Sequence, residues 1–220
     1  MARPEFKLGR SRQDADFLTW FWPRTPENED FTRRLSRVHV MGNIKNGKIL
    51  LHDSGSTNES TFEGLPLHFE QNNEIKRRGT LFLGHEYAVD ITPFETTLPG
   101  GLQIRNERAW NGPPAKSLGV SGSVRFIPSN SEVALYDALW LFTDANFGSS
   151  RLNALVLGLS NIGEVEGRFH YHRGNFWIEA YQGSMIRIGA VALRPNEIVP
   201  LTHAHEVVIG GTAFRVTIEA

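Results

Sequence analysis

Three polar clusters in the first 60 residues hold the groups that a phosphate dianion requires. Each follows or precedes a β-type apolar run: Leu8-Gly9-Arg10, Arg34-Leu35-Ser36-Arg37-Val38-His39 and Asp53-Ser54-Gly55-Ser56-Thr57-Asn58. A phosphate monoester brings about −1.5 to −2 charges and three acceptor oxygens, so it needs several converging donors. Arginine supplies a planar fork of N–H groups, and Ser and Thr each add a hydroxyl. The clusters predict an anion site if the fold brings them together.

The other chemically capable residues form weaker patterns. Two His-x-His pairs, His170/His172 and His203/His205, would each place two imidazoles on one strand face, which is the beginning of a metal site. Only Glu206 stands at a suitable ligand spacing, so we expect solvent-facing histidines and no metal. Nucleophile-elbow, P-loop and dinucleotide-binding motifs are missing from the sequence. We therefore expect no catalytic residues, no cofactor and no enzyme activity.

The elements that must position these clusters are short β-strands. Helical periodicity is scarce, whereas alternating, β-branched or aromatic runs are separated by Gly, Pro, Asn or Asp. The expected strands are Lys48–Leu51, Thr80–Leu83, Tyr87–Ile91, Ser123–Ile127, Ala154–Leu157, Phe176–Ile178, Glu206–Ile209 and Ala213–Ile218. This pattern is typical of an all-β sandwich or barrel.

The two halves of the chain look like copies of one unit. Leu8–Leu18 aligns without gaps to Phe147–Leu157, and Asn73–Ile91 is similar to Asn196–Ile218. More residues separate the two aligned segments in the first copy than in the second, and these extra residues fall in Trp20–Arg34. We expect the aromatic residues of that segment to pack in the core or a loop. The Pro- and Gly-rich stretch predicts a linker over 96–120, between a domain of 1–95 and a domain of 121–220.

The three clusters, taken in order, resemble the signature of the forkhead-associated (FHA) family. That signature is Gly-Arg, then Ser-x-x-His, then a Ser-x-Asn turn that follows Asp, and it is matched here by Gly9-Arg10, Ser36–His39 and Ser56–Asn58. The resemblance covers about Glu5–Phe94 well and Ser121–Ala220 faintly. It implies two tandem FHA-type sandwiches of eleven strands, in which the loops at one end hold a phosphothreonine peptide.

The resemblance also implies a role for each matched residue. Arg10 and Ser36 would hold the phosphate oxygens, Thr57 and Arg37 would add contacts, and Asn58 would bond the peptide backbone. Arg34 would favour an acidic residue three positions after the phosphothreonine. Four further residues would support the loops: Gly9, His39, Asp53 and Ser56.

Two departures from the family pattern affect these expectations. Glu59 stands where the family usually has Gly, often at positive φ, where another residue costs on the order of 1 kcal/mol. In the second half, the phosphate donors and the loop brace are replaced by Ser149, Glu164, Glu166 and Ala180. Because carboxylates repel a phosphate, we expect the second copy to keep the fold without the site.

One strand's worth of chain is missing at the start of the first copy. The strand Tyr87–Ile91 would then present an unpaired edge, which proteins seldom leave bare. The segment Leu102–Arg105 alternates apolar and polar residues, and glycines precede it. We expect a strand near 101–105 to fold back and complete the first domain.

Composition narrows the functional classes. The chain has 220 residues, a net charge of −1 and no cysteine, which argues against a nucleic-acid partner and suits the cytoplasm. No segment is apolar enough to span a bilayer, so we expect no membrane partner. The sequence favours an adaptor that binds a phosphothreonine-containing protein, a Ser/Thr kinase substrate. The alternative is a phosphate-independent scaffold that binds partners through its sheet faces.

Overall fold

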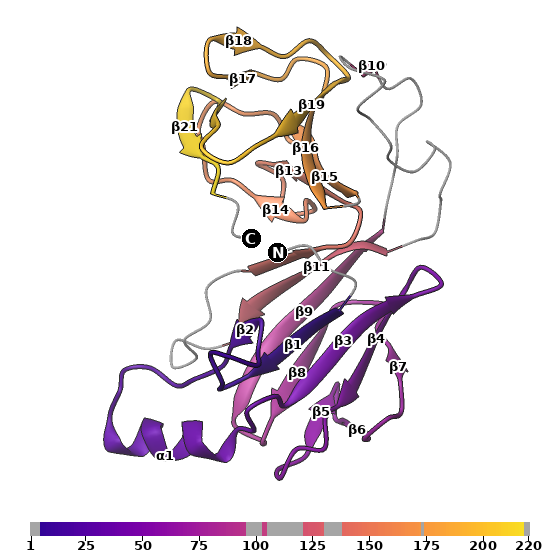
Figure 1. Cartoon of the computed structure of the whole chain (residues 1–220), viewed down its shortest axis with the longest axis vertical. Coiled ribbons are helices and arrows are strands. Elements are labelled where there is room, and N and C mark those ends of the chain that lie inside the picture. The colour runs from indigo at the N-terminus through magenta and orange to yellow at the C-terminus, as the bar shows by residue number, and fades with distance from the viewer. Residues whose placement is uncertain (1–4, 96–102, 105–120, 130–137, 173, 218–220) are drawn as a thin grey trace. The chain divides into compact units, whose positions relative to one another are not determined.

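The computed structural model describes residues 5–95, 103–104, 121–129, 138–172 and 174–217. The described chain is almost entirely β, with a single helix, α1 (Pro26–Arg34), among the described residues (Figure 1). It divides into two compact units: Arg3–Phe94 with Val124–Trp140, and Glu95–Ser123 with Leu141–Ala220. The expectation of an all-β chain made of two sandwich-type units is confirmed.

Unit 1 consists of two sheets. The five-stranded sheet runs in the order β2 (Phe17–Leu18), β1 (Glu5–Gly9), β3 (Val40–Lys45), β4 (Lys48–Asp53), β7 (Asn73–Glu74). The six-stranded sheet runs in the order β12 (Ala138–Leu141), β11 (Ser121–Pro128), β9 (Tyr87–Glu95), β8 (Gly79–Leu83), β5 (Ser60–Phe62), β6 (Leu65–Leu67).

The core of unit 1 is closed by aromatic side chains from β11 and β12. Alternation along β1 buries Phe6 and Leu8, while Lys7 faces the other side of the sheet. The Phe6 ring lies 5.2 Å from that of Phe126 on β11 and 5.4 Å from that of Trp140 on β12. Both of these side chains are fully buried, so unit 1 depends on them for its packing.

Strand β11 corrects two expectations. It pairs with β9 and belongs, from Val124 onward, to unit 1, so the predicted boundary at residue 121 is wrong. The segment near 101–105 does not cover β9: Gln103–Ile104 form β10, which pairs in parallel with Glu197–Ile198 of unit 2, and the rest of it lies outside the described residues. The eight-residue β11 buries Val124 and Phe126, which a two-residue strand cannot match.

Unit 2 repeats most of this arrangement. One sheet runs in the order β10 (Gln103–Ile104), β19 (Glu197–Leu201), β16 (Asn175–Ala180), β15 (Gly167–His172), β13 (Asp144–Gly148), β14 (Leu155–Val156). The other runs in the order β18 (Val191–Ala192), β17 (Ile186–Ile188), β20 (Glu206–Ile209), β21 (Thr212–Arg215). Within the described part of the chain, no strand covers the free edge of β21 as β11 covers β9.

The extra residues of unit 1 form the helix α1 and the segment before it. Thr25 caps the helix by accepting from the Asn28 N–H at 3.2 Å, and Pro26 occupies the first turn. Phe21 is buried and meets Tyr87 edge to face at 5.4 Å, whereas Trp22 is exposed. None of the described helices is long and apolar enough to cross a membrane.

Candidate functional site

The three polar clusters meet at one end of the five-stranded sheet. Leu8 of β1 is opposite Val40 of β3, and Val40 is opposite Asp53 of β4. Because the three strands alternate in direction, the segment after β1, the segment before β3 and the segment after β4 emerge side by side. Hydrogen bonds join them, one from Arg10 N–H to the Ser36 carbonyl (3.1 Å) and one from Thr57 N–H to the Ser36 side-chain hydroxyl (3.3 Å).

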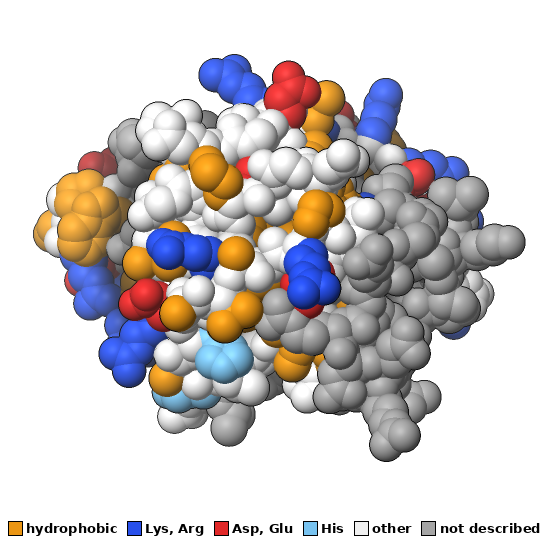
Figure 2. Space-filling view, turned by 90° about the horizontal axis from the view of Figure 1, so that it is seen from above, with side chains coloured by type: hydrophobic (Ala, Val, Ile, Leu, Met, Phe, Trp, Pro, Cys, Tyr) orange, Lys and Arg blue, Asp and Glu red, His pale blue; other side chains and the backbone are white. Residues whose placement is uncertain are grey.

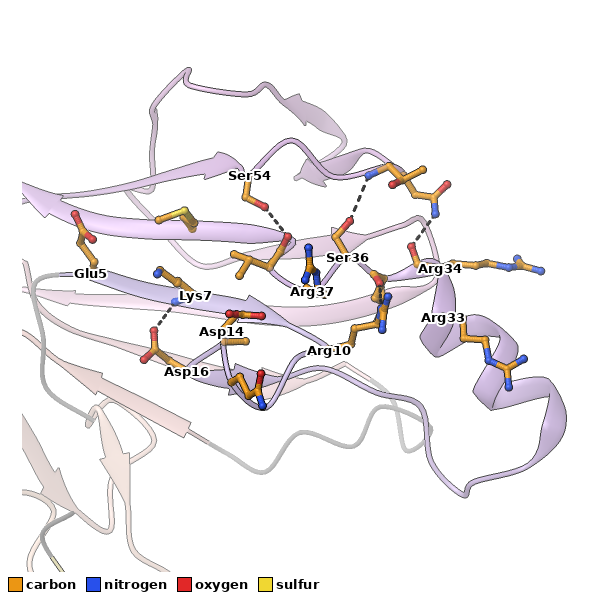
Figure 3. A pocket seen from close by; sticks show the side chains of 17 residues that line it. Glu5, Lys7, Arg10, Asp14, Asp16, Arg33, Arg34, Ser36, Arg37 and Ser54 are labelled. Carbon is orange, nitrogen blue, oxygen red and sulfur yellow. Dashed lines mark hydrogen bonds between the residues drawn. The ribbon is translucent and has the colours of Figure 1, made fainter. Parts of the chain in front are cut away.

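A cavity of about 1060 Å³ lies over these loops and continues along β1 (Figure 3). At the loop end, Arg10 and Arg37 stand beside Ser36, and Thr57 and Asn58 also line the wall. Further along β1 the lining includes Lys7 and the carboxylates of Glu5, Asp14 and Asp16. The cavity is therefore rich in cations and hydroxyls at the loops and of mixed charge further along.

The guanidinium groups of Arg10 and Arg37 differ in how they are held. Arg10 Nε donates to the Leu35 carbonyl at 2.6 Å, which leaves the two terminal nitrogens for other partners. The Arg37 side chain is exposed and lines the cavity, while its carbonyl accepts from Ser11 N–H at 3.2 Å. Both groups can turn N–H donors toward an anion above Ser36.

His39 braces two of the loops from beneath. It is fully buried, and its Nδ1 accepts from Ser36 N–H at 2.9 Å, so Nε2 carries the proton and donates to the Asn58 carbonyl at 2.7 Å. Burial lowers the pKa of His39, although the bond to Asn58 and the charge of Asp53 act against this effect. The neutral ring thus couples the Ser36 loop to the Asn58 loop.

Asp53 organises the turn that carries Thr57 and Asn58. Its Oδ1 accepts from Gly55 N–H (2.8 Å) and Ser56 N–H (2.6 Å), and its Oδ2 from the hydroxyls of Ser56 (2.7 Å) and Ser60 (2.8 Å). Burial alone would raise the pKa of Asp53, but the bonds from Ser56, Ser60 and Gly55 outweigh burial and lower it. The turn is therefore fixed by an ionised carboxylate.

Two backbone positions explain the local sequence. A side chain at Gly9 would overlap the Arg37 carbonyl, so the close approach of β1 to the Ser36 loop requires glycine. Glu59 is not among the residues with positive φ; in this turn that conformation belongs to Gly55, at 83°. The strain expected at Glu59 therefore does not arise.

Arg34 and Asn58 already have intramolecular partners. The Arg34 guanidinium forms an ion pair with Glu86 at 3.1 Å and lies over the Phe31 ring at 4.8 Å. Asn58 Nδ2 donates to the Arg34 carbonyl at 2.7 Å. Asn58 thus joins its loop to the end of α1, and an acidic ligand group would compete with Glu86 for the Arg34 guanidinium.

Sequence reasoning missed two features of the site. Ser54 lines the cavity, and its hydroxyl donates to the Val38 carbonyl at 2.6 Å. The other is the helix α1, whose last turn carries Arg33 and the predicted Arg34 to the wall. The sequence contains the signals that predict this helix. Thr25 is a typical N-cap, Pro26 is a typical first residue, and acidic residues in the first turn are followed by arginines in the last.

The equivalent loops of unit 2 keep the scaffold and replace its chemistry. Ser149 N–H donates to the Gly163 carbonyl at 3.0 Å, as Arg10 does to Ser36, so Ser149 occupies the place of Arg10. The expected loss of the brace is wrong, because buried Glu166 takes over the position of His39. Its carboxylate accepts from Gly163 N–H (2.8 Å) and Met185 N–H (2.5 Å).

The brace in unit 2 reverses the polarity of one of its two hydrogen bonds, the one to the Met185 loop. Met185 corresponds to Glu59, since the Gly210 N–H donates to the Met185 carbonyl and the Gly84 N–H to the Glu59 carbonyl, both at 3.2 Å. The peptide group before Glu59 offers its carbonyl to the imidazole of His39. The matching peptide group before Met185 offers its N–H to a carboxylate. A donor has thus been replaced by an acceptor, while the link between the loops is kept.

One of the paired histidines, His170, is buried although the sequence predicted that it would face solvent. His170 is only 2% exposed, and its Nε2 lies 2.8 Å from Glu179 Oε2, so the prediction of a solvent-facing His170 is wrong. His205 Nε2 lies 2.9 Å from the Thr202 hydroxyl. Among the described residues, no group of three or more His, Cys, Asp or Glu side chains could hold a metal ion.

The fold and the site define an all-β protein with a cationic, hydroxyl-lined cavity at the loop end of one unit. No family model matches the chain, and no curated protein matches it. One solved structure similar to part of it is Mycobacterium tuberculosis EmbR in complex with a low-affinity phosphopeptide. The match has 17% identity and a TM-score of 0.34, and it covers 40% of this chain and 23% of EmbR.

Proposed function

We propose that unit 1 is an FHA-type module that binds phosphothreonine peptides, and that the protein is a non-enzymatic cytoplasmic adaptor. The partner would be a phosphothreonine-containing substrate of a Ser/Thr kinase. The observation that supports this proposal is the convergence of Arg10, Arg37, Ser36 and Thr57 on one cavity, over loops already tied together by His39 and Asp53. A preorganised set of donors is what phosphate recognition without a metal requires.

Each side chain has a distinct part in the proposed complex. Arg10 and Ser36 bind phosphate oxygens, and Arg37 and Thr57 add donors from either side. Asn58 holds the peptide backbone, and Arg34 pairs with an acidic residue three positions after the phosphothreonine once Glu86 is displaced. The preference for threonine over serine is implied by the family resemblance.

We propose neither a nucleic-acid partner nor a membrane partner. On the face drawn in Figure 2, the coloured Lys and Arg side chains are spread among polar and hydrophobic ones rather than forming a continuous stripe. With a net charge of −1, the chain also lacks the overall positive charge that backbone-driven nucleic-acid binding uses.

Titration calorimetry of the full chain with one peptide in phosphothreonine, phosphoserine and unphosphorylated forms tests the proposal. We expect binding in the order phosphothreonine, phosphoserine, unphosphorylated. Arg10→Ala should weaken the binding of the phosphothreonine peptide by about 2–3 kcal/mol, or roughly 30- to 150-fold in affinity. This is the scale of lost charge-assisted hydrogen bonds. Arg12→Ala is the matched control, because Arg12 stacks on Trp20 at 5.4 Å and does not line the cavity.

Equal affinity for the phosphorylated and unphosphorylated peptides would contradict the proposal. In the same titration followed by NMR, amide shifts should map to unit 1. Shifts in residues 148–189 would show instead that unit 2 binds the phosphopeptide, against the replacement of its donors by Ser149, Glu164 and Glu166.

A further inference from the structure

The cavity of unit 1 extends well beyond the loops that would hold a phosphate group. Its volume of about 1060 Å³ slightly exceeds the roughly 300–1,000 Å³ of typical small-molecule sites, so a phosphothreonine side chain alone would leave most of it empty. In Figure 3, Arg34 lies at one end of the cavity and Glu5 at the other, with Ser36 between them. The cavity therefore has room for ligand residues on both sides of a phosphate bound above Ser36.

The charge of the cavity lining changes sign along its length. At the loop end, the charged side chains in the lining are all arginines: Arg10, Arg33, Arg34 and Arg37. Along β1 and the segment that follows it, three carboxylates line the cavity against one ammonium group: Glu5, Asp14 and Asp16 against Lys7. A ligand that carries an anion at the loops therefore meets an excess of negative charge further along, and a cation there would complement it.

The Asp14 carboxylate is held in place on the cavity wall. Its Oδ2 accepts from the Ser11 hydroxyl at 2.7 Å, and Ser11 N–H donates to the Arg37 carbonyl at 3.2 Å. These two bonds connect Asp14 to the loop that carries Ser36, while its side chain stays exposed. Within the described part of the chain, neither Asp14 nor Glu5 forms an ion pair. Each can therefore take a basic partner from a ligand.

The carboxylates are spread along the wall rather than gathered at one point. Glu5 stands five residues before Arg10, which corresponds to about 17 Å of extended chain at about 3.3 Å per residue. Asp16 accepts from the backbone N–H of Lys7 at 2.9 Å, which fixes it against β1. Among the described residues, no group of three or more His, Cys, Asp or Glu side chains could hold a metal ion. This spacing suits the side chains of an extended peptide.

We propose that this part of the cavity recognises a Lys or Arg two to five positions before the phosphothreonine, with Asp14 and Glu5 as the specificity-determining residues. The proposal rests on the proposed function of unit 1, which places the residues after the phosphothreonine at Arg34. The carboxylates lie on the other side of Ser36, and so beside the residues that precede the phosphothreonine (Figure 3). The basic group pairs with Asp14 or Glu5, and its aliphatic stem packs on half-buried Met41. The partners are then threonines phosphorylated in a basic context.

The test is titration calorimetry of the full chain with one phosphothreonine peptide, in which a single Lys or Ala is placed at each position before and after the phosphothreonine in turn. We expect Lys at two to five positions before it to raise the affinity about three- to fivefold over Ala, the scale of an exposed ion pair, and less at high salt. In the double variant Glu5→Gln/Asp14→Asn, this ratio should fall to about one. Glu59→Gln is the matched control and should keep the ratio, because Glu59 is an exposed carboxylate of unit 1 that does not line the cavity.

Three results would overturn this proposal and leave the proposed function intact. They are phosphate-dependent binding with equal affinity for the Lys and Ala peptides, a Lys gain that persists in the double variant, and a Lys gain confined to positions after the phosphothreonine. Binding that does not depend on phosphate would contradict the proposed function and this proposal together. If the double variant binds neither peptide, Asp14→Asn decides alone, because this exposed loop position can change without loss of the fold.

Discussion

Replacing Asp53 should loosen the loop end of unit 1 more than any other single change there. The carboxylate is 5% exposed and accepts four hydrogen bonds from three residues: Gly55, Ser56 and Ser60. Asp53→Ala leaves the fully buried Ser60 hydroxyl without this acceptor. Bonds to a charged group contribute about 1.5–3 kcal/mol each, but these four act as a unit, so we expect a loss of about 3–5 kcal/mol. Asp53→Asn keeps one acceptor oxygen and should cost about 1–2 kcal/mol.

Hydrogen exchange followed by NMR measures this loss where it occurs. A chain of two units need not unfold in one step, so a single melting curve does not isolate unit 1. Exchange reports each strand separately, and the amides of β4 and β5 should lose protection in Asp53→Ala while those of β16 in unit 2 serve as the internal reference. Phosphopeptide affinity should fall as well, because Thr57 and Asn58 lose their fixed turn.

Unchanged protection of β4 and β5 in Asp53→Ala would refute the role given to the carboxylate. Acidification offers an independent check. Because the folded-state pKa of Asp53 is lowered, its contribution is present above the ordinary value of 3.8 and is lost as the pH falls further. The difference in stability between the wild type and Asp53→Asn should therefore shrink below that pH.

Three further predictions concern Arg34, His39 and β11. Glu86→Gln frees the Arg34 guanidinium, so the preference for Asp over Ala three positions after the phosphothreonine should grow by up to about fivefold, the scale of an exposed ion pair; an unchanged ratio in peptide titrations would contradict this. The lowered pKa of buried His39 means that its contribution to stability is present above pH 6.5 and is lost as the pH falls below that value; the protection of the β3 and β5 amides against hydrogen exchange should drop accordingly, and less so in His39→Gln. Phe126→Ala should cost about 3–5 kcal/mol and speed exchange in β1 and β9; faster exchange confined to unit 2 would show that β11 belongs there.

The candidate site could be predicted largely because its determinants are local. Arg10, Ser36 and Thr57 each stand in a turn beside a short strand, and β1, β3 and β4 pair as neighbours with Leu8, Val40 and Asp53 in line. Turn residues and alternation fix such strand ends within a few residues of sequence. The partners of these residues were less predictable. Arg34 meets Glu86 across 52 residues of sequence, and no local pattern specifies that pair.

The sequence by itself determined the all-β class, the two related halves and the residues gathered at the loops of unit 1. Only the tertiary structure decided which unit receives β11 and how unit 2 holds its loops. A strand's alternation shows that it will pair but not with which edge, because the choice depends on the core that Phe126 and Trp140 complete against Phe6. Likewise, the sequence shows only that Glu166 replaces a histidine. The structure shows that its carboxylate accepts hydrogen bonds from two backbone N–H groups and so keeps the link between the loops. A brace is defined by its hydrogen bonds, which either an imidazole or a carboxylate can make.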